Sequence, residues 1–157
     1  MCKKMKKKEI VKWETLNFNH EIFQKFKMLV VETDLYGVKY NFSIDTGANE
    51  NIIDEKIDKE LYDRIWIPDV EQDDGFFITG IGDDIAKSNL RKITITVANM
   101  NESMMANVLN LDNINRFFQN DIYIAGIIGN IFIKKASWII DFHRLTIWYP
   151  MIYDDKE

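Results

Sequence analysis

The segment from residue 38 to residue 48 constrains the fold of this chain more than any other part of the sequence. Val38, Tyr40 and Phe42 alternate with other residues, which is typical of a β-strand with one buried face. The apolar pattern then ends at Asp45, inside a short turn that contains a glycine. A buried strand end holds such a side chain rigidly, so the sequence predicts an acidic group held in a defined place.

Much of the remaining sequence extends this β pattern. Residues 26–44 predict two strands around a turn at residues 34–37, and Ile93, Ile95 and Val97 alternate as in a half-buried strand. Further strands are predicted beside a glycine-rich bend at residues 76–85, at 106–111, at 122–128, and in a closing hairpin at 138–140 and 145–149. The pattern predicts a mainly β, largely antiparallel barrel.

Two helices are predicted. Ile53, Ile57, Leu61 and Ile65 recur every four residues among charged residues, which indicates an amphipathic helix with one face on a core. Residues 131–136 predict a short helix near the C-terminus.

Length and composition favour one globular domain. The chain has 157 residues, of which 46% are hydrophobic and 29% charged, and no internal repeat or low-complexity linker divides it. The formal net charge of -5 argues against nucleic acid as a partner, because no basic surplus exists to neutralise phosphates. The basic run at residues 3–8 is interpreted as a solvated terminus.

Several other kinds of site are disfavoured. No stretch of 18 apolar residues occurs, so no membrane-spanning segment is expected. The two histidines, His20 and His143, lie far apart, and no paired histidine or cysteine motif occurs, so neither a metal nor a cofactor is predicted. The single cysteine, Cys2, cannot form an internal disulfide. The expected location is cytoplasmic, although a trimmed lipoprotein or exported form remains an alternative because a cysteine follows Met1.

The turn at Asp45 has two interpretations. In the first, Thr46 fixes the turn through its hydroxyl, Gly47 supplies backbone freedom and close approach, and Asp45 does chemistry. In the second, this is an ordinary strand-to-helix turn in which Asp45 only accepts hydrogen bonds from backbone amides.

Three short strings resemble retropepsins, the aspartic proteases of retroviral type. Asp45-Thr46-Gly47-Ala48 resembles their active-site signature, Thr79-Gly80-Ile81-Gly82 the tip of their flap hairpin, and Ile127-Ile128-Gly129-Asn130 the motif before their C-terminal helix. The strings occur in the order found in the family. Ile131 departs from the acidic residue of many relatives, and the flap lacks a tyrosine near its tip. The resemblance implies a retropepsin-like domain over residues 26–157, with residues 1–25 as an extension of unknown role.

The resemblance also implies a mechanism. Two carboxylates about 4 Å apart repel by roughly 4 kcal/mol at an effective dielectric near 20, or about three pKa units, so one stays protonated. The ionised one activates water against a peptide carbonyl and the protonated one acts as general acid. The chain contains one Asp-Thr-Gly string, so the second carboxylate must come from another copy in a homodimer.

The remaining predicted roles follow from the same resemblance. Thr46, Gly47 and Ala48 support the loop, residues 79–82 cover a peptide or protein substrate, and Ile128 and Gly129 pack behind the active loop. The alternative function is a noncatalytic peptide- or protein-binding module with the same fold.

Overall fold

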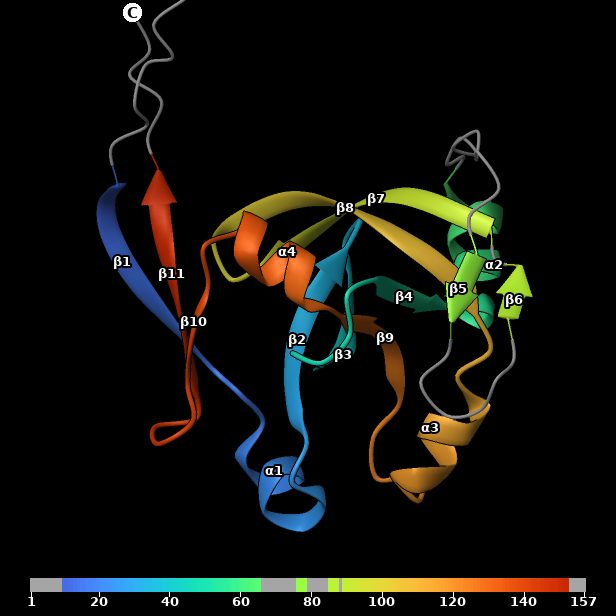
Figure 1. The fold of residues 1–157 in the computed structure, drawn as a ribbon, viewed down its shortest axis with the longest axis horizontal. Helices are drawn as coiled ribbons and strands as arrows, with labels where there is room; N and C mark the ends of the chain where they lie inside the picture. The colour runs from blue at the N-terminus through green and yellow to red at the C-terminus, as the bar shows by residue number, and fades with distance from the viewer. Residues whose placement is uncertain (1–9, 66–75, 79–84, 88, 153–157) are drawn as a thin grey trace, which may run out of the picture.

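A closed barrel of six strands forms the centre of the molecule (Figure 1). The computed structural model describes residues 10–65, 76–78, 85–87 and 89–152. Around the barrel the strands follow the order β2 (Leu29–Leu35), β3 (Val38–Ile44), β9 (Ile124–Ile128), β4 (Asn51–Asp54), β8 (Met100–Leu109) and β7 (Asn89–Val97). A pairing of Asp34 with Thr96 joins β2 to β7 and closes the barrel. The mainly β barrel predicted from the sequence is confirmed.

Not every pair in the barrel is antiparallel. β3 runs parallel to β9, and β4 runs parallel to β8. Side-chain alternation reports which face of a strand is buried and carries no information on the direction of its neighbour. The other four pairings of the barrel are antiparallel, so the prediction of a largely antiparallel barrel is confirmed, and the two parallel pairs are a detail that the sequence did not reveal.

The β2–β3 hairpin forms where the sequence predicts it. Its two loop residues, Tyr36 and Gly37, both have positive φ, of 52° and 90°. Such turns match the twist of the flanking strands. Asp34 Oδ1 accepts a hydrogen bond from the Gly37 amide at 2.7 Å, which stabilises the turn.

The amphipathic helix begins later than predicted. Ile53 lies in strand β4, and helix α2 (Glu55–Arg64) starts after Asp54, whose side chain accepts from the Lys56 amide. Ile57 and Leu61 are buried, as the spacing of four predicts. The error at the start arises because Ile53 keeps the helical spacing while its backbone belongs to a strand.

The other predicted elements shift by a few residues. β8 runs from Met100 and ends before Leu111, β9 begins at Ile124, and helix α4 spans Asn130–Lys135. β5 (Phe76–Ile78) pairs with β6 (Ile85–Lys87) as a hairpin, while the bend at 79–84 lies outside the described residues.

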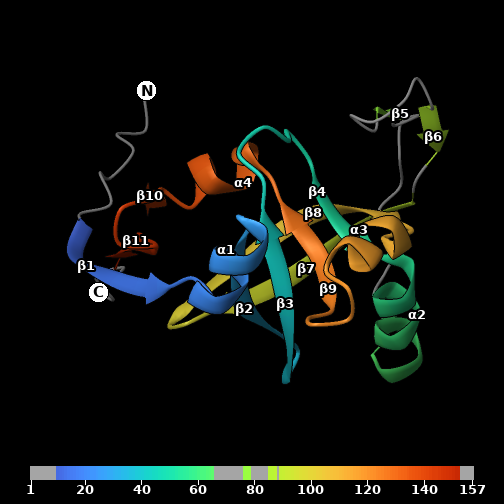
Figure 2. The same cartoon turned by 90° about the horizontal axis from the view of Figure 1, so that it is seen from below.

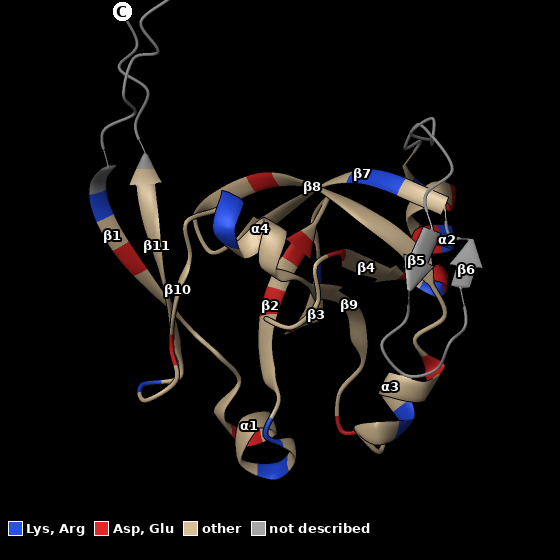
Figure 3. Ribbon diagram, viewed as in Figure 1, with Lys and Arg blue, Asp and Glu red and all other residues tan. Residues whose placement is uncertain are grey.

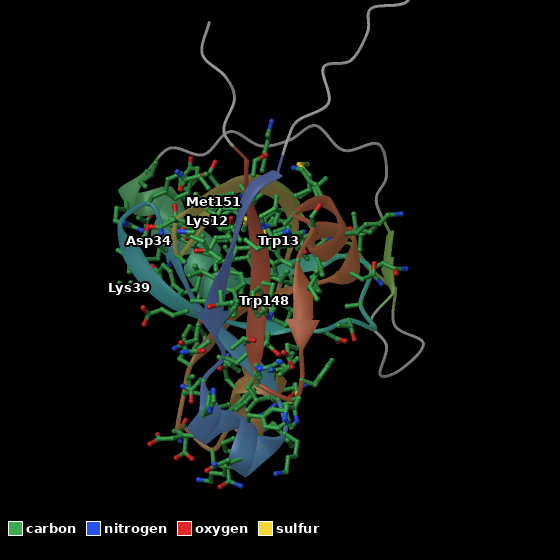
Figure 4. All side chains as sticks on the ribbon, turned by 90° about the vertical axis from the view of Figure 1, so that its left-hand side faces the viewer. Lys12, Trp13, Asp34, Lys39, Trp148 and Met151 are labelled. Carbon is green, nitrogen blue, oxygen red and sulfur yellow. The ribbon has the colours of Figure 1, made fainter. Side chains whose placement is uncertain are left out.

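A second, three-stranded sheet lies beside the barrel (Figures 1 and 2). It contains β10 (Ile139–Asp141) and β11 (Thr146–Ile152), the predicted closing hairpin, and a strand that the sequence reasoning missed, β1 (Ile10–Asn17). Figure 4 looks onto the outer face of this sheet, where Trp13 and Trp148 lie. The division of the chain at residue 25 stays a prediction, although β1 is paired with β11 along its length.

Two short helices were also not predicted. They are α1 (His20–Phe26) and α3 (Asp112–Phe117). Neither is long enough to show a clear helical period in the sequence. α1 begins at an Asn19 cap, whose Oδ1 accepts from the Ile22 amide at 3.0 Å.

The barrel interior and the space under α4 form one core. Phe42, Ile53, Ile95 and Ile128 are fully buried in it. Phe132 of α4 packs edge-on against Trp138, with ring centroids 5.3 Å apart. This contact packs α4 against the segment before β10, and α4 itself directly follows β9, next to the loop that carries Asp45.

Candidate active site

Asp45 is exposed directly beyond a buried strand. Ile44, the last residue of β3, is 5% exposed, and the next residue emerges from the barrel. The Asp45 amide donates to the carbonyl of Ile128 at 3.0 Å, which extends the parallel β3–β9 pairing by one more bond. The backbone of Asp45 is therefore held by the barrel while its side chain faces outward.

The turn after Asp45 is closed by its own hydrogen bonds. Asp45 Oδ1 accepts from the Gly47 amide at 2.9 Å, and the Asp45 carbonyl accepts from the Ala48 amide at 3.2 Å. Asp45 therefore does accept a hydrogen bond from a backbone amide, as expected for an ordinary strand-to-helix turn. This bond occupies one carboxylate oxygen, and Oδ2 has no hydrogen-bond partner among the described residues.

Among the residues that the structure describes, the Thr46 hydroxyl makes no hydrogen bond that would hold the turn. That hydroxyl is exposed and has no hydrogen bond to any described residue, while the Thr46 carbonyl accepts from Asn130 Nδ2 at 3.3 Å. The expectation of special backbone freedom at Gly47 needs correction, while the close approach of a substrate there stays a prediction. The φ of Gly47 lies outside the left-handed range, so the turn does not require the special backbone freedom of glycine there.

Asn130 is a site residue to which the sequence reasoning assigned no role. Its amide donates to the Ala48 carbonyl at 2.7 Å, and its side chain donates to Asn49 Oδ1 at 3.1 Å as well as to Thr46. The signal was present, because Asn130 directly follows the Ile-Ile-Gly string. Its importance depends on a contact between segments more than 80 residues apart, which spacing alone does not show.

Gly129 lies where two backbone segments come close together. A Cβ on this residue would lie 2.5 Å from the carbonyl oxygen of Glu50 and 2.7 Å from that of Ala48. Its amide donates to Asn51 Oδ1 at 2.9 Å, and Ile128 before it is fully buried. The loop after Asp45 thus rests directly on the segment that joins β9 to α4, as Figures 1 and 2 show.

A second carboxylate in this half of the barrel has a different environment. Asp54 is fully buried, accepts from the Lys56 and Leu111 amides, and accepts a hydrogen bond from the Tyr123 hydroxyl. Burial, followed by the hydrogen bond to Asp54, raises the pKa of Tyr123 well above its usual range. Asp54 is engaged in capping and packing, whereas Asp45 is exposed to solvent.

The predicted flap residues Thr79, Gly80, Ile81 and Gly82 lie outside the described residues. Strands β5 and β6 lead into and out of that bend. In the described part of the chain, no three histidine, cysteine or carboxylate side chains gather as metal ligands would. Over the same residues, no helix is long and apolar enough to cross a membrane.

Comparison with solved structures identifies the architecture. The retroviral protease-like domain of Ddi1 from Leishmania major superimposes with a TM-score of 0.53 at 14% identity, covering 83% of this chain and 97% of that one. A retropepsin-like aspartic protease from Rickettsia conorii superimposes with a TM-score of 0.54 at 12% identity, covering 91% and 94%. The chain has the retropepsin-like fold. No family model matches the sequence, and no curated protein matches it.

The retropepsin-like fold agrees with the resemblance stated from the three short strings. At 12 to 14% identity, the likeness concerns the course of the backbone. Function has to be argued from the side chains of this chain.

Proposed function

We propose that the chain is an aspartic endopeptidase whose active site forms when two copies bring their Asp45 side chains together. The observation that carries this proposal is the state of Asp45 itself. It is exposed, its backbone is held by Ile128, and one of its carboxylate oxygens has no hydrogen-bond partner among the described residues. A fixed acidic group with a free oxygen suits proton transfer to and from a water molecule.

On this proposal the second carboxylate comes from a second copy, because the sequence contains one Asp-Thr-Gly string. Asp54 is buried and hydrogen-bonded through both oxygens, so it does not reach the same solvent-facing site. A twofold axis beside the loop would bring the two Asp45 residues together and leave one proton shared between them. The exposed Thr46 hydroxyl, unpaired among the described residues, would then face the other copy's loop.

In this arrangement the ionised Asp45 takes a proton from a water molecule, which attacks the peptide carbon. The protonated Asp45 of the other copy donates to the carbonyl oxygen. The C–N bond then breaks as the leaving nitrogen takes up the proton that the first Asp45 removed from water, and the other Asp45 recovers its proton from a hydroxyl group of the intermediate. The hydrogen bonds from Asn130 and Gly47 keep the two carboxyl groups in position without using the oxygens that act on substrate.

A peptide-library cleavage assay from pH 3 to pH 7 tests this function. We expect the wild-type chain to cleave peptides in the acidic part of this range and the Asp45→Asn variant to lose at least about a thousandfold in rate, because the base and acid pair is removed. Asp63→Asn is the matched control, since Asp63 is an exposed carboxylate on α2. Equal cleavage by wild type and Asp45→Asn would contradict the proposal, and absence of cleavage with retained peptide binding would favour a noncatalytic module.

A further inference from the structure

A pocket of about 340 Å³ lies beside the loop that carries Asp45. Its lining includes Asn49, four residues after Asp45, and Ile131, the residue after Asn130. Asn130 hydrogen bonds to both Asn49 and the Thr46 carbonyl. The pocket and the candidate active loop therefore share one hydrogen-bonded wall.

The pocket lies where strand β8 extends further than its neighbour β4. The β4–β8 pairing starts at Asn51 opposite Ala106, so residues 103–105 of β8 lie beyond it. Helix α4 flanks the pocket beside residues 103–105 of β8, and Lys135 Nζ donates to the Ser103 carbonyl at 3.0 Å. On the same stretch, Asn51 Nδ2 donates to the Met105 carbonyl at 3.0 Å. The wall is thus built from fixed backbone.

Two basic side chains flank this pocket, one from β7 and one from α4, the basic segments seen in Figure 3. Lys92 of β7 lies opposite Met105, is exposed, and has no hydrogen bond or ion pair with any described residue. Lys135 comes from α4, and Glu50 is the one acidic side chain among the described lining residues. The local charge is positive in a chain of net charge -5.

The remaining lining is suited to an aliphatic stem. Met105 is half-buried in the wall, and Ile131 exposes 59% of its surface at the edge. A side chain with methylene groups and a terminal carboxylate would place its stem against Met105 and Ile131 and its charge at Lys92. Glutamate has this shape and charge.

We propose that this pocket is a substrate subsite that selects an acidic side chain near the scissile bond, with Lys92 as the residue that determines the selection. The inference rests on the proposed endopeptidase function. Lys92 donates a charge-assisted hydrogen bond to the substrate carboxylate, and Lys135 adds positive potential while it stays bound to Ser103. The negative charge of Glu50 repels a substrate carboxylate from its part of the pocket. The carboxylate is therefore expected to bind beside Lys92.

The test is a peptide library in which each position in turn holds glutamate, glutamine or lysine. For wild type we expect one position where glutamate gives a kcat/KM about fivefold above glutamine, the size expected of a charge-assisted bond at a partly exposed site. Lys92→Glu should reverse this order and favour lysine. Lys134→Glu is the matched control, because Lys134 is an exposed lysine on α4 outside the pocket lining, and it should keep the wild-type preference.

Binding of the same library to the Asp45→Asn variant, with and without Lys92→Glu, separates the subsite from turnover. Selection of glutamate that disappears with Lys92→Glu supports the subsite even if wild type cleaves nothing. Equal use of glutamate and glutamine at every position, or equal effects of Lys92→Glu and Lys134→Glu, would overturn the subsite whether or not Asp45-dependent cleavage is found.

Discussion

At the scale of single residues, the position of Asp45 depends mainly on its neighbours. Its backbone is bound to Ile128, and the loop after it rests on Gly129 and Asn130. Two of the three short strings of the sequence thus act together, because they meet in space. The third lies outside the described residues.

Gly129→Ala should destabilise the protein strongly, although it adds only one methyl group. The added Cβ meets two backbone carbonyl oxygens, of Glu50 and Ala48, which cannot rotate away as a side chain would. Overpacking of this kind costs about 1–3 kcal/mol in the free energy of unfolding. Urea denaturation of the purified variant measures the change.

Gly47→Ala serves as the comparison. Its added Cβ would lie 3.3 Å from Asp45 Oδ1, a side-chain atom that has room to shift. We expect a loss of less than about 1 kcal/mol in stability, with a larger loss of activity because the Asp45 carboxylate moves. A Gly129→Ala variant as stable as Gly47→Ala would show that the loop does not rest on Gly129 as described.

At the scale of elements, strand β1 is tied to the rest of the molecule through Glu14. Glu14 Oε2 accepts from the Tyr149 hydroxyl of β11 at 3.0 Å and from Asn99 Nδ2, between β7 and β8, at 3.3 Å. The hydrogen bond from Asn99, followed by those from Tyr149 and Lys12, lowers the pKa of the Glu14 carboxyl. This side chain therefore links the three-stranded sheet to the barrel in its ionised form.

Acid should loosen β1 through this carboxylate. Because the folded pKa is lowered, the stabilisation is complete above the ordinary value of about 4.5 and is lost as pH falls through the folded pKa. Between pH 5 and pH 3, wild type should lose more stability than Glu14→Gln, which has no proton to gain. Urea midpoints followed by tryptophan fluorescence measure this, since Trp13 and Trp148 lie on that sheet (Figure 4).

Glu21→Gln is the control for this experiment, because Glu21 is an exposed carboxylate on α1. Its stability should fall with acid as steeply as that of wild type. The assignment to Glu14 fails if the stability of Glu14→Gln falls with acid as steeply as that of wild type and of Glu21→Gln.

At the scale of the whole molecule, the proposed enzyme needs two copies of one loop. The exposed Asp45 and Thr46 side chains are the groups that a partner would meet. Such a site makes activity depend on the fraction of paired chains, and so on protein concentration.

Subunit mixing tests this dependence. When wild type is allowed to exchange with an equal amount of Asp45→Asn, random pairing puts about half of the wild-type subunits into mixed pairs with one Asp45, so activity should fall to roughly half. Adding Asp63→Asn instead should raise activity, because every pair then has both Asp45 residues. Unchanged activity after mixing with Asp45→Asn would indicate that a single chain is sufficient.

Local patterns in the sequence were enough to predict the β2–β3 hairpin, the strand β7, the closing hairpin and the position of Asp45 at a strand end. Each depends on a period of two or four residues, or on turn residues next to one another, and these periods follow directly from backbone geometry. Family resemblance then indicated the retropepsin-like fold, which comparison with solved structures confirms.

Contacts between distant segments were decided by tertiary structure. The pairing of β1 with β11, the support of the loop by Asn130, and the pocket between β8 and α4 each join parts of the chain that no local period relates. They arise because closing the barrel sets which strand ends become neighbours, and only then do particular amides, carbonyls and charges come within bonding distance.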